Sequence, residues 1–184
     1  MHASDNAAPE HAIRPCDSAD LSAIAHIVNA AAGAYRGAIP PDRWHEPYLP
    51  RAELDAEIAA GVRFTGLVAA GELVGVMGLQ PVRNVHLIRH AYVLPAWQGR
   101  GVGSKLLREL CRDISTPVLI GTWRAATWAV AFYQRHGFVT VPDAAVAALL
   151  RTYWDIPPRQ IETSVVLAAP ALSLEDARAL LAAA

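Results

Sequence analysis

The chain is poor in cysteine and has no long apolar run. Only two of its 184 residues are cysteines, Cys16 and Cys111, and they lie far apart in the sequence. Such a pair gives neither a disulfide framework nor the close spacing of a zinc site, and it suits a reducing compartment. No apolar stretch reaches the ~18 residues that a membrane span needs. We therefore expect a cytoplasmic protein with no bound metal and no membrane partner.

The chain also has no large excess of positive or negative charge. The formal net charge is −1 and charged residues make up 18% of the chain. Without a long basic run the sequence offers no electrostatic footprint for nucleic acid. A secretory signal is not expected either, because no apolar core interrupts the polar start MHASDNAAPEHAI. What the chain has instead is 53% hydrophobic residues, which is enough for a well-filled core.

Alternating apolar patterns predict one domain of mixed α/β (α+β) class over residues 12–169. A flexible arm is expected over 1–11, and a helical tail over 170–184 whose leucines can support a homodimer. The expected strands are 12–14, 62–69, 72–80, 85–93, 118–123, 138–141 and 159–168. The expected helices are 17–32, 51–60, 101–113, 125–136, 143–153 and 173–181.

A glycine-rich turn between a strand and a helix is the most informative segment. Gly99, Gly101 and Gly103 leave the backbone N–H groups at the helix start unobstructed, which suits an anion such as a diphosphate. The Gly-x-Gly-x-Gly spacing is not the Rossmann fingerprint, and Ser104 and Lys105 stand in the wrong order for a Walker loop. The alternative is a tight connection with no ligand.

Two motifs resemble those of the GNAT acyltransferase superfamily. The family's Gln/Arg-x-x-Gly-x-Gly/Ala motif is matched from Gln98 to Gly103, and its later Phe-Tyr-x-x-x-Gly-Phe motif is matched from Phe132 to Phe138. The resemblance covers residues 12–168. It implies a single mixed, mostly antiparallel sheet of about 6–7 strands flanked by helices, splayed at the strand before the glycine turn.

The resemblance also implies a co-substrate and a reaction. The co-substrate would be acetyl-CoA, and the protein would be an N-acetyltransferase that moves the acetyl group to a primary amine of a small molecule or peptide by direct attack. Val93 and Leu94 would pair with the pantetheine arm, and one of their amides would stabilise the oxyanion. The residues expected to hold the diphosphate are Gln98, Gly99, Arg100, Gly101, Val102, Gly103 and Ser104.

Tyr133 matches the family's general acid toward the leaving thiolate. A phenol is neutral at pH 7, with an ordinary pKa of about 10, and has one proton to give; the alternative is a core aromatic. Some relatives place a glutamate base where this chain has Leu87, so His90 is the candidate base on that strand. The further candidates are His86, His45, Glu46, Glu53 and a water chain.

The acceptor is expected to meet an aromatic loop that contains Tyr35, Trp44 and Tyr48. These rings suit an apolar or cationic acceptor. The opposite choice, an acidic acceptor, is offered by Arg36, Arg43, Arg83 and Arg89. Ala126 replaces an asparagine that many relatives carry, which favours the alternative of a non-catalytic acyl-CoA-binding module. A plain interaction domain that dimerises through its tail is a third hypothesis.

Overall fold

The computed structural model describes residues 11–184, so nearly all of the arm expected over 1–11 lies outside the described residues. Seven strands form one sheet in the order β1-β2-β3-β4-β5-β7-β6. The strands are β1 (Ala12–Pro15), β2 (Arg63–Ala69), β3 (Glu72–Val82), β4 (Val85–Val93), β5 (Val118–Trp123), β6 (Val139–Thr140) and β7 (Ser164–Ala169). Neighbouring strands are antiparallel except β4 and β5. The mixed, mostly antiparallel sheet predicted from the sequence is confirmed.

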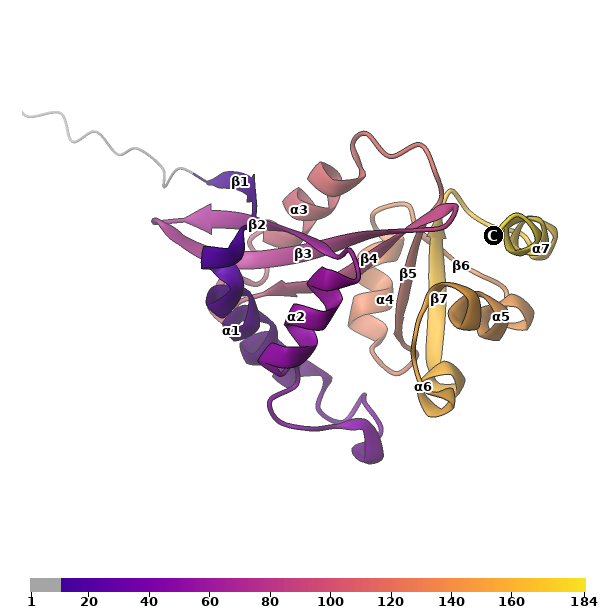
Figure 1. Ribbon diagram of the computed structural model, residues 1–184, viewed down its shortest axis with the longest axis horizontal. Helices are drawn as coiled ribbons and strands as arrows, with labels where there is room; N and C mark the ends of the chain where they lie inside the picture. The colour runs from indigo at the N-terminus through magenta and orange to yellow at the C-terminus, as the bar shows by residue number, and fades with distance from the viewer. Residues whose placement is uncertain (1–10) are drawn as a thin grey trace, which may run out of the picture.

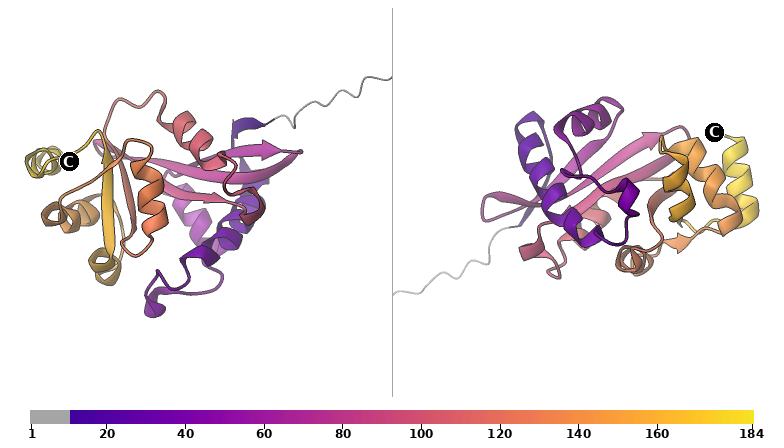
Figure 2. Two further views of the ribbon diagram at one scale, coloured as in Figure 1. Left: turned by 180° about the vertical axis from the view of Figure 1, so that it is seen from behind. Right: turned by 90° about the horizontal axis from the view of Figure 1, so that it is seen from below.

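Helices cover both faces of this sheet (Figures 1 and 2). They are α1 (Leu21–Ala32), α2 (Arg51–Ala59), α3 (Val102–Cys111), α4 (Thr127–Gln134), α5 (Asp143–Tyr153), α6 (Pro158–Thr163) and α7 (Leu174–Ala182). Helices α3 and α4 pack on one face, while α1, α2 and α5 pack on the other. The strands β2 to β4 and the pair β5 and β7 run in different directions in Figure 1, so the sheet opens between β4 and β5.

The buried central strands follow the two-residue alternation of a pleated sheet. In β5, Val118 and Ile120 join the cluster under α3 and α4, whereas Leu119 joins the cluster under α5. In β7, Leu167 and Val166 divide between the same two clusters. Because both faces are covered, these strands read in the sequence as continuous apolar runs.

One predicted strand is wrong over half its length. Residues 159–168 were expected to be extended, but Pro158–Thr163 is helix α6 and the strand begins only at Ser164. Pro158 occupies the first turn of α6, where a missing N–H costs nothing. The residues that follow are good helix formers, and the β-branched pair Val165 and Val166 starts the strand.

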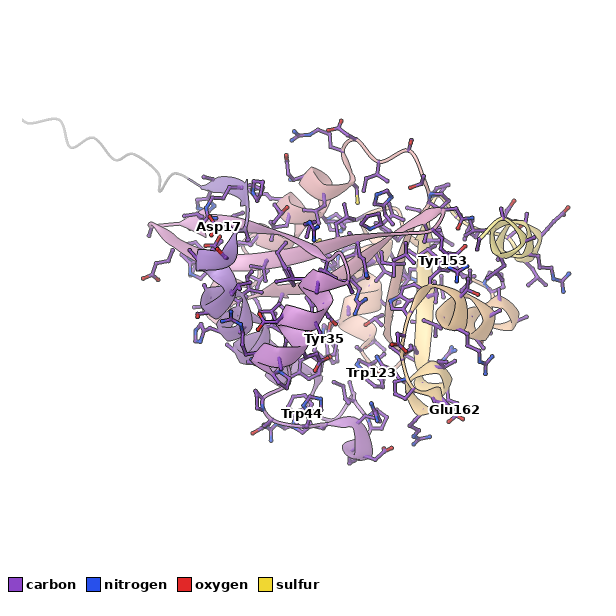
Figure 3. The ribbon with its side chains drawn as sticks, in the orientation of Figure 1. Asp17, Tyr35, Trp44, Trp123, Tyr153 and Glu162 are labelled. Atoms are coloured by element: carbon purple, nitrogen blue, oxygen red, sulfur yellow. The ribbon has the colours of Figure 1, made fainter. Side chains whose placement is uncertain are left out.

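The C-terminal helix α7 docks within the chain. Ala177 is fully buried, and Tyr153 on α5 donates a hydrogen bond to Asn84, whose amide donates to the carbonyl of Leu180 at 3.0 Å. Figure 3 shows Tyr153 beside these elements. The tail leucines pack against the core under α5; they are Leu172, Leu174, Leu180 and Leu181. The apolar residues that favoured a tail-mediated homodimer are thus already used inside the chain.

The hydrogen bonds that Asp20 accepts at the start of the first helix should contribute measurably to the free energy of unfolding. Asp20 accepts hydrogen bonds from the Asp17 amide at 2.9 Å and from Arg14 at 2.6 Å and 2.8 Å. We expect Asp20→Asn to lower the free energy of unfolding at pH 7 by about 1–2 kcal/mol, because it removes a cap and an ion pair together. Denaturant unfolding measures the difference, and Asp55→Asn, which breaks an exposed pair with Arg51, is the control.

The effect of Asp20→Asn on the free energy of unfolding should also depend on pH. The hydrogen bond from Arg14 outweighs the effect of burial and lowers the pKa of Asp20 from 3.8 to about 2. A group whose pKa is lowered by folding stabilises the protein above its unfolded pKa and loses that effect as the pH falls through the folded one. The difference in free energy of unfolding between the wild type and Asp20→Asn should therefore become smaller as the pH falls from 3.8 to about 2. A difference that stays constant over this range would contradict the assignment.

Candidate active site

The site is built where β4 and β5 separate. The two strands pair only over His86–Ile88 and Val118–Ile120. Beyond that point β4 continues against β3, and β5 continues against β7. The diverging edges leave backbone N–H and C=O groups without a neighbouring strand, which is the arrangement that an extended ligand can pair with.

Two cavities adjoin in this opening. The larger cavity, of about 300 Å³, lies toward α2, α6 and the connection between α1 and α2. The smaller cavity, of about 230 Å³, lies toward α3 and α4 and includes Val93, Gln98 and Gly103. Four residues line both cavities: Tyr35, Ala91, Tyr92 and Tyr133.

Tyr133 on α4 stands at the junction of the two cavities. Its ring is held edge-on by Phe132 and Phe138, at centroid distances of 5.1 Å and 5.9 Å. Burial raises the pKa of Tyr133 well above its ordinary value, so its hydroxyl keeps its proton through the neutral range. The core-aromatic interpretation and the general-acid interpretation thus describe the same ring, which packs in the core and also borders both cavities.

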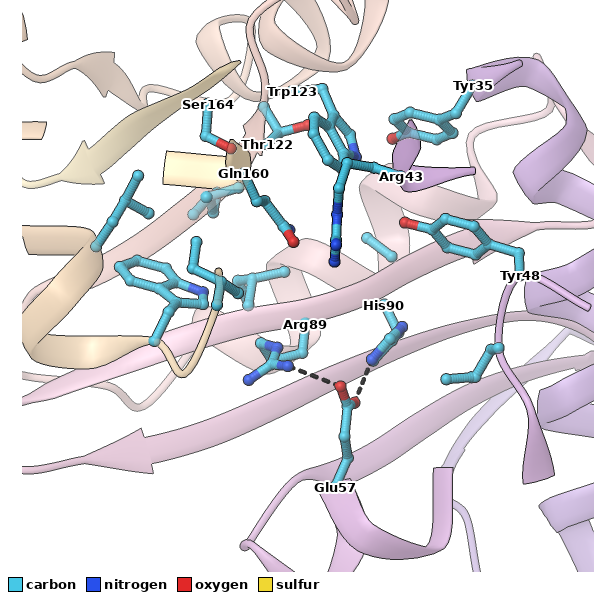
Figure 4. A pocket seen from close by; sticks show the side chains of 18 of the residues that line it. Tyr35, Arg43, Tyr48, Glu57, Arg89, His90, Thr122, Trp123, Gln160 and Ser164 are labelled. Carbon is cyan, nitrogen blue, oxygen red and sulfur yellow. Dashed lines mark hydrogen bonds and ion pairs between the residues drawn. The ribbon is translucent and has the colours of Figure 1, made fainter. Parts of the chain in front are cut away.

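A β-bulge places His90 in the larger cavity. Val76 pairs with Tyr92 and Gly78 with Arg89, so Met77 alone faces both His90 and Ala91. His90 has a left-handed backbone with φ of 48°. A bulge of this kind redirects a side chain out of the regular alternation. His90 Nε2 lies against the carboxylate of Glu57, and Figure 4 shows the pair at the floor of the cavity.

Glu57 on α2 links His90 to a second cation. Arg89 donates to Glu57 at 2.8 Å and to Gln80 at 2.9 Å. Burial raises the pKa of the Glu57 carboxyl, but the hydrogen bonds and charges of His90 and Arg89 outweigh it and lower that pKa overall. Glu57 is therefore ionised at neutral pH. Glu57 was not predicted from the sequence, although it lies one helical turn after Glu53 and on the same face of α2.

The glycine turn ends at a helix start with free backbone amides. Gly99 and Gly101 have φ of 73° and 78°, a region that favours glycine, and Gly101 is the N-cap of α3. The first amide that closes the helix is that of Lys105, which donates to the Gly101 carbonyl at 3.0 Å. By helix geometry the N–H groups of the first turn, from Val102 to Ser104, have no intrahelical partner.

Only one of the two backbone amides that were expected to stabilise the oxyanion is free at the end of β4. The Leu94 amide donates to the Val74 carbonyl at 2.9 Å, so it is not free for an oxyanion. In an antiparallel ladder, hydrogen-bonded pairs alternate with non-bonded pairs. Val93 faces Gly75 one position away, so its N–H and C=O point away from β3 and into the opening. Gln98 extends its side-chain amide to the Val93 carbonyl at 3.1 Å.

The aromatic loop reaches the site with two of its three predicted rings. Tyr35 and Tyr48 line the larger cavity, whereas Trp44 does not. Trp44 stacks on Tyr48 at 5.7 Å and lies under the Arg36 guanidinium at 5.1 Å, so it supports the wall without forming it. Figure 3 labels Tyr35, Trp44 and Trp123 in this part of the molecule, and Tyr35 packs against the cluster that contains Trp123.

Several other predicted candidates lie elsewhere. His86 bonds Thr116 at 2.7 Å and lines neither cavity, and Glu46 pairs with Arg36 at the surface. Leu87 is fully buried under α5, so the carboxylate near the base comes from a helix and not from this strand. The residues of the larger cavity that the sequence analysis missed also include Thr122, Trp123, Gln160 and Ser164. Gln160 was not recognised as a site residue because the segment that forms α6 was expected to be part of a strand.

Metal and membrane features are not found in residues 11–184. Within this range no three His, Cys, Asp or Glu side chains gather as metal ligands. None of the helices in the same part of the chain is long and apolar enough to cross a membrane. Ala126 stands where the resemblance implies an asparagine. It is fully buried beside Ile39 and Trp123 at the N-cap of α4, and it lines neither cavity.

Comparisons with known proteins give a matching family model and solved structures of the same fold. Residues 62–140 match the family model described as acetyltransferase (GNAT) domain. PaiA N-acetyltransferase from Thermoplasma acidophilum, solved with coenzyme A, superposes with a TM-score of 0.64 and 17% identity over 86% of this chain and 98% of that one. No protein of curated function matches the sequence.

Two further structures have the same fold. The ribosomal-protein-S18-alanine N-acetyltransferase from Escherichia coli has a TM-score of 0.60 and 17% identity, over 86% of this chain and 92% of its own. A GNAT family acetyltransferase from Brucella melitensis, solved with acetyl-CoA, has a TM-score of 0.53 and 22% identity, over 72% and 84%. Residues 62–140 are thus similar to the acetyltransferase (GNAT) domain, and the chain has the fold of these acetyltransferase structures.

Proposed function

We propose that the protein is an acetyl-CoA-dependent N-acetyltransferase that acetylates a primary amine of a small molecule or peptide by direct attack in a ternary complex. The observation that carries this proposal is the position of Tyr133 between two cavities. One cavity adjoins the free amides of α3, and the other contains the His90–Glu57 pair. Such an arrangement lets two substrates meet at one proton donor.

The smaller cavity fits the co-substrate. The first-turn amides of α3, with the positive end of the helix dipole, suit a diphosphate, and Gly99 and Gly101 have open space where a side chain would stand. The Val93 edge suits the amides of a pantetheine arm. Acetyl-CoA, when bound, supplies an acetyl group activated as a thioester.

Three groups of this chain carry the proposed chemistry. His90, held by Glu57, accepts a proton from the acceptor amine, directly or through water. The Val93 amide donates a hydrogen bond to the developing oxyanion. Tyr133 gives its proton to the departing thiolate.

The cysteines favour direct attack over an acyl-enzyme. Burial raises the pKa of the Cys16 thiol to about 11 and also raises the pKa of Cys111. A protonated thiol is a poor nucleophile, and neither cysteine lines the two cavities. Both thiols are free, which suits the cytoplasmic location that we also propose.

Two measurements test the proposal and separate it from a non-catalytic binding module. Calorimetry with coenzyme A should show saturable binding, and a thiol-release assay with acetyl-CoA and a broad amine library should show turnover. Binding without turnover of any amine would favour the module, to which the loss of the family's asparagine at Ala126 points. If coenzyme A does not bind to the folded protein, both the transferase and the binding-module hypotheses are excluded.

Gly103 allows a sharp test of the diphosphate site. We expect Gly103→Asp to weaken coenzyme A binding by at least about tenfold, because it adds a negative charge beside the proposed anion site. An acidic residue in the first turn normally stabilises a helix, so the loss would not come from unfolding of α3. Calorimetry measures the affinity.

Gly103→Ala is the matched control for this substitution. Its added methyl group would lie 3.4 Å from the Phe132 ring, which is close to ordinary contact, and it adds no charge. We expect binding within about threefold of wild type, because the methyl group makes only ordinary van der Waals contact with Phe132 and brings no charge to the anion site. Equal affinities for the aspartate and alanine variants would place the diphosphate elsewhere.

A further inference from the structure

The larger cavity contains an arginine with a buried donor and no partner. Arg43 ends the short 3-10 helix Pro41–Arg43, and its Nε is buried without a hydrogen bond in the described structure. Figure 4 shows its guanidinium turned into the cavity, toward the space above Arg89 and His90 and beside Gln160. A buried donor left unsatisfied costs free energy that a ligand can recover.

The other charges of the cavity do not neutralise Arg43. Arg89 is already engaged with Glu57 and Gln80. Among residues 11–184, none of the ion pairs includes Arg43. Glu53 and Asp155 also line the cavity, but they are exposed to solvent. The cavity therefore has one inward-facing cation to satisfy and carboxylates at its rim.

The loop that carries Arg43 is fastened next to α6. Asp42, its neighbour in the chain, pairs with Arg159 at 3.6 Å, and Gln160 follows Arg159 into the cavity lining. The contact places the Arg43 loop beside α6, so the guanidinium and the Gln160 amide lie on the same side of the cavity. Two donor groups thus converge on one volume opposite His90, as Figure 4 shows.

We infer that the acceptor is an amino-carboxylate, whose carboxylate binds Arg43 and whose amine faces His90 and Tyr133. A guanidinium fork matches the two oxygens of a carboxylate. The amine, charged in solution, is favoured by the acidic rim of Glu53 and Asp155. These rim carboxylates repel a doubly charged phosphate more strongly than a singly charged carboxylate, so they favour the carboxylate. This inference rests on the proposed function and chooses between the cationic and acidic acceptors that the sequence leaves open.

Matched acceptors test the inference. Glycine, L-methionine and L-phenylalanine would each be compared with the corresponding carboxamide in the thiol-release assay, together with the aminophosphonate analogue of glycine. We expect kcat/KM of the wild type to favour the carboxylates by about 10- to 100-fold, the worth of a charge-assisted hydrogen-bonded pair. The inference would be overturned if the carboxamides or the phosphonate had a kcat/KM equal to that of the carboxylates.

Variants of Arg43 make the assignment specific to this residue. Arg43→Gln should lower kcat/KM for the carboxylates to about the level of the carboxamides, and Arg43→Lys should restore part of the preference for carboxylates. The control is Arg36→Gln, in the same loop, because Arg36 is exposed and pairs with Glu46. A preference that survives in Arg43→Gln would overturn the inference.

A binding measurement separates this inference from the proposed function. If no amine is turned over, the thermal shift of the protein with coenzyme A and each amino acid decides the question. A carboxylate-specific shift that Arg43→Gln removes supports the acidic-acceptor site even though the transferase proposal fails. No shift with any carboxylate, in protein that binds coenzyme A, overturns the inference by itself.

Discussion

Tyr133→Phe is expected to lower kcat by about 100-fold or more and to leave the affinity for coenzyme A within about twofold. General acids contribute about 10²- to 10⁴-fold, and the substitution removes only the hydroxyl from a ring that Phe132 and Phe138 hold in place. Steady-state thiol release measures the rate, and calorimetry measures the affinity.

The pH profile adds a second readout for Tyr133. Because burial raises its pKa, the hydroxyl should stay protonated as the pH rises toward the ordinary phenol value of about 10. The wild type should therefore lose no activity through Tyr133 below that pH. An unchanged rate for Tyr133→Phe across the profile would show that another group, or water, protonates the thiolate.

His90→Asn is the second substitution with a large expected effect. Asparagine tolerates the left-handed backbone that His90 adopts, so the bulge in β4 should persist. We expect kcat/KM to fall by about 100-fold at neutral pH, the usual contribution of a general base. The loss should shrink at alkaline pH, where more of the acceptor amine is already uncharged. An equal loss at every pH would assign His90 a structural role.

Glu57→Gln separates positioning from catalysis. Glu57 acts on the acceptor only through His90, so we class it as a positioning residue. Its loss should lower kcat more than it changes KM, and Glu57→Asp should restore part of the rate. Asp55→Asn, on the same helix but in an exposed pair with Arg51 and outside both cavities, is the control. Unfolding measurements are needed beside the kinetics, because breaking a half-buried ion pair can cost about 3–5 kcal/mol.

Local patterns predicted most of the fold. Apolar runs gave β5 and α5 with their observed bounds, Val118–Trp123 and Asp143–Tyr153, because burial and helix periodicity are written directly in those residues. The failure over 159–168 has a physical reason. A short polar helix beside a strand has no period of its own, and only the packing of Ile161 under α5 fixes it.

The candidate site divides in the same way. The glycine turn and Tyr133 were found from the sequence because their chemistry lies in contiguous residues. Glu57 was missed because its significance depends on a distant residue, His90, which only the bulge in β4 brings to it. The engagement of the Leu94 amide by Val74 is likewise invisible in the sequence, since it depends on strand register.

The sequence alone determined the class of domain and identified the glycine turn and Tyr133 as candidates for the anion site and the proton donor, because each of these predictions depends on neighbouring residues and their local pattern. The tertiary structure decided where β4 and β5 part, which amide stays free, and which side chains meet above His90. These are contacts between residues 20 or more positions apart, such as Leu94 with Val74 and Glu57 with His90. Their geometry comes from packing and register, which no local stretch of the chain encodes.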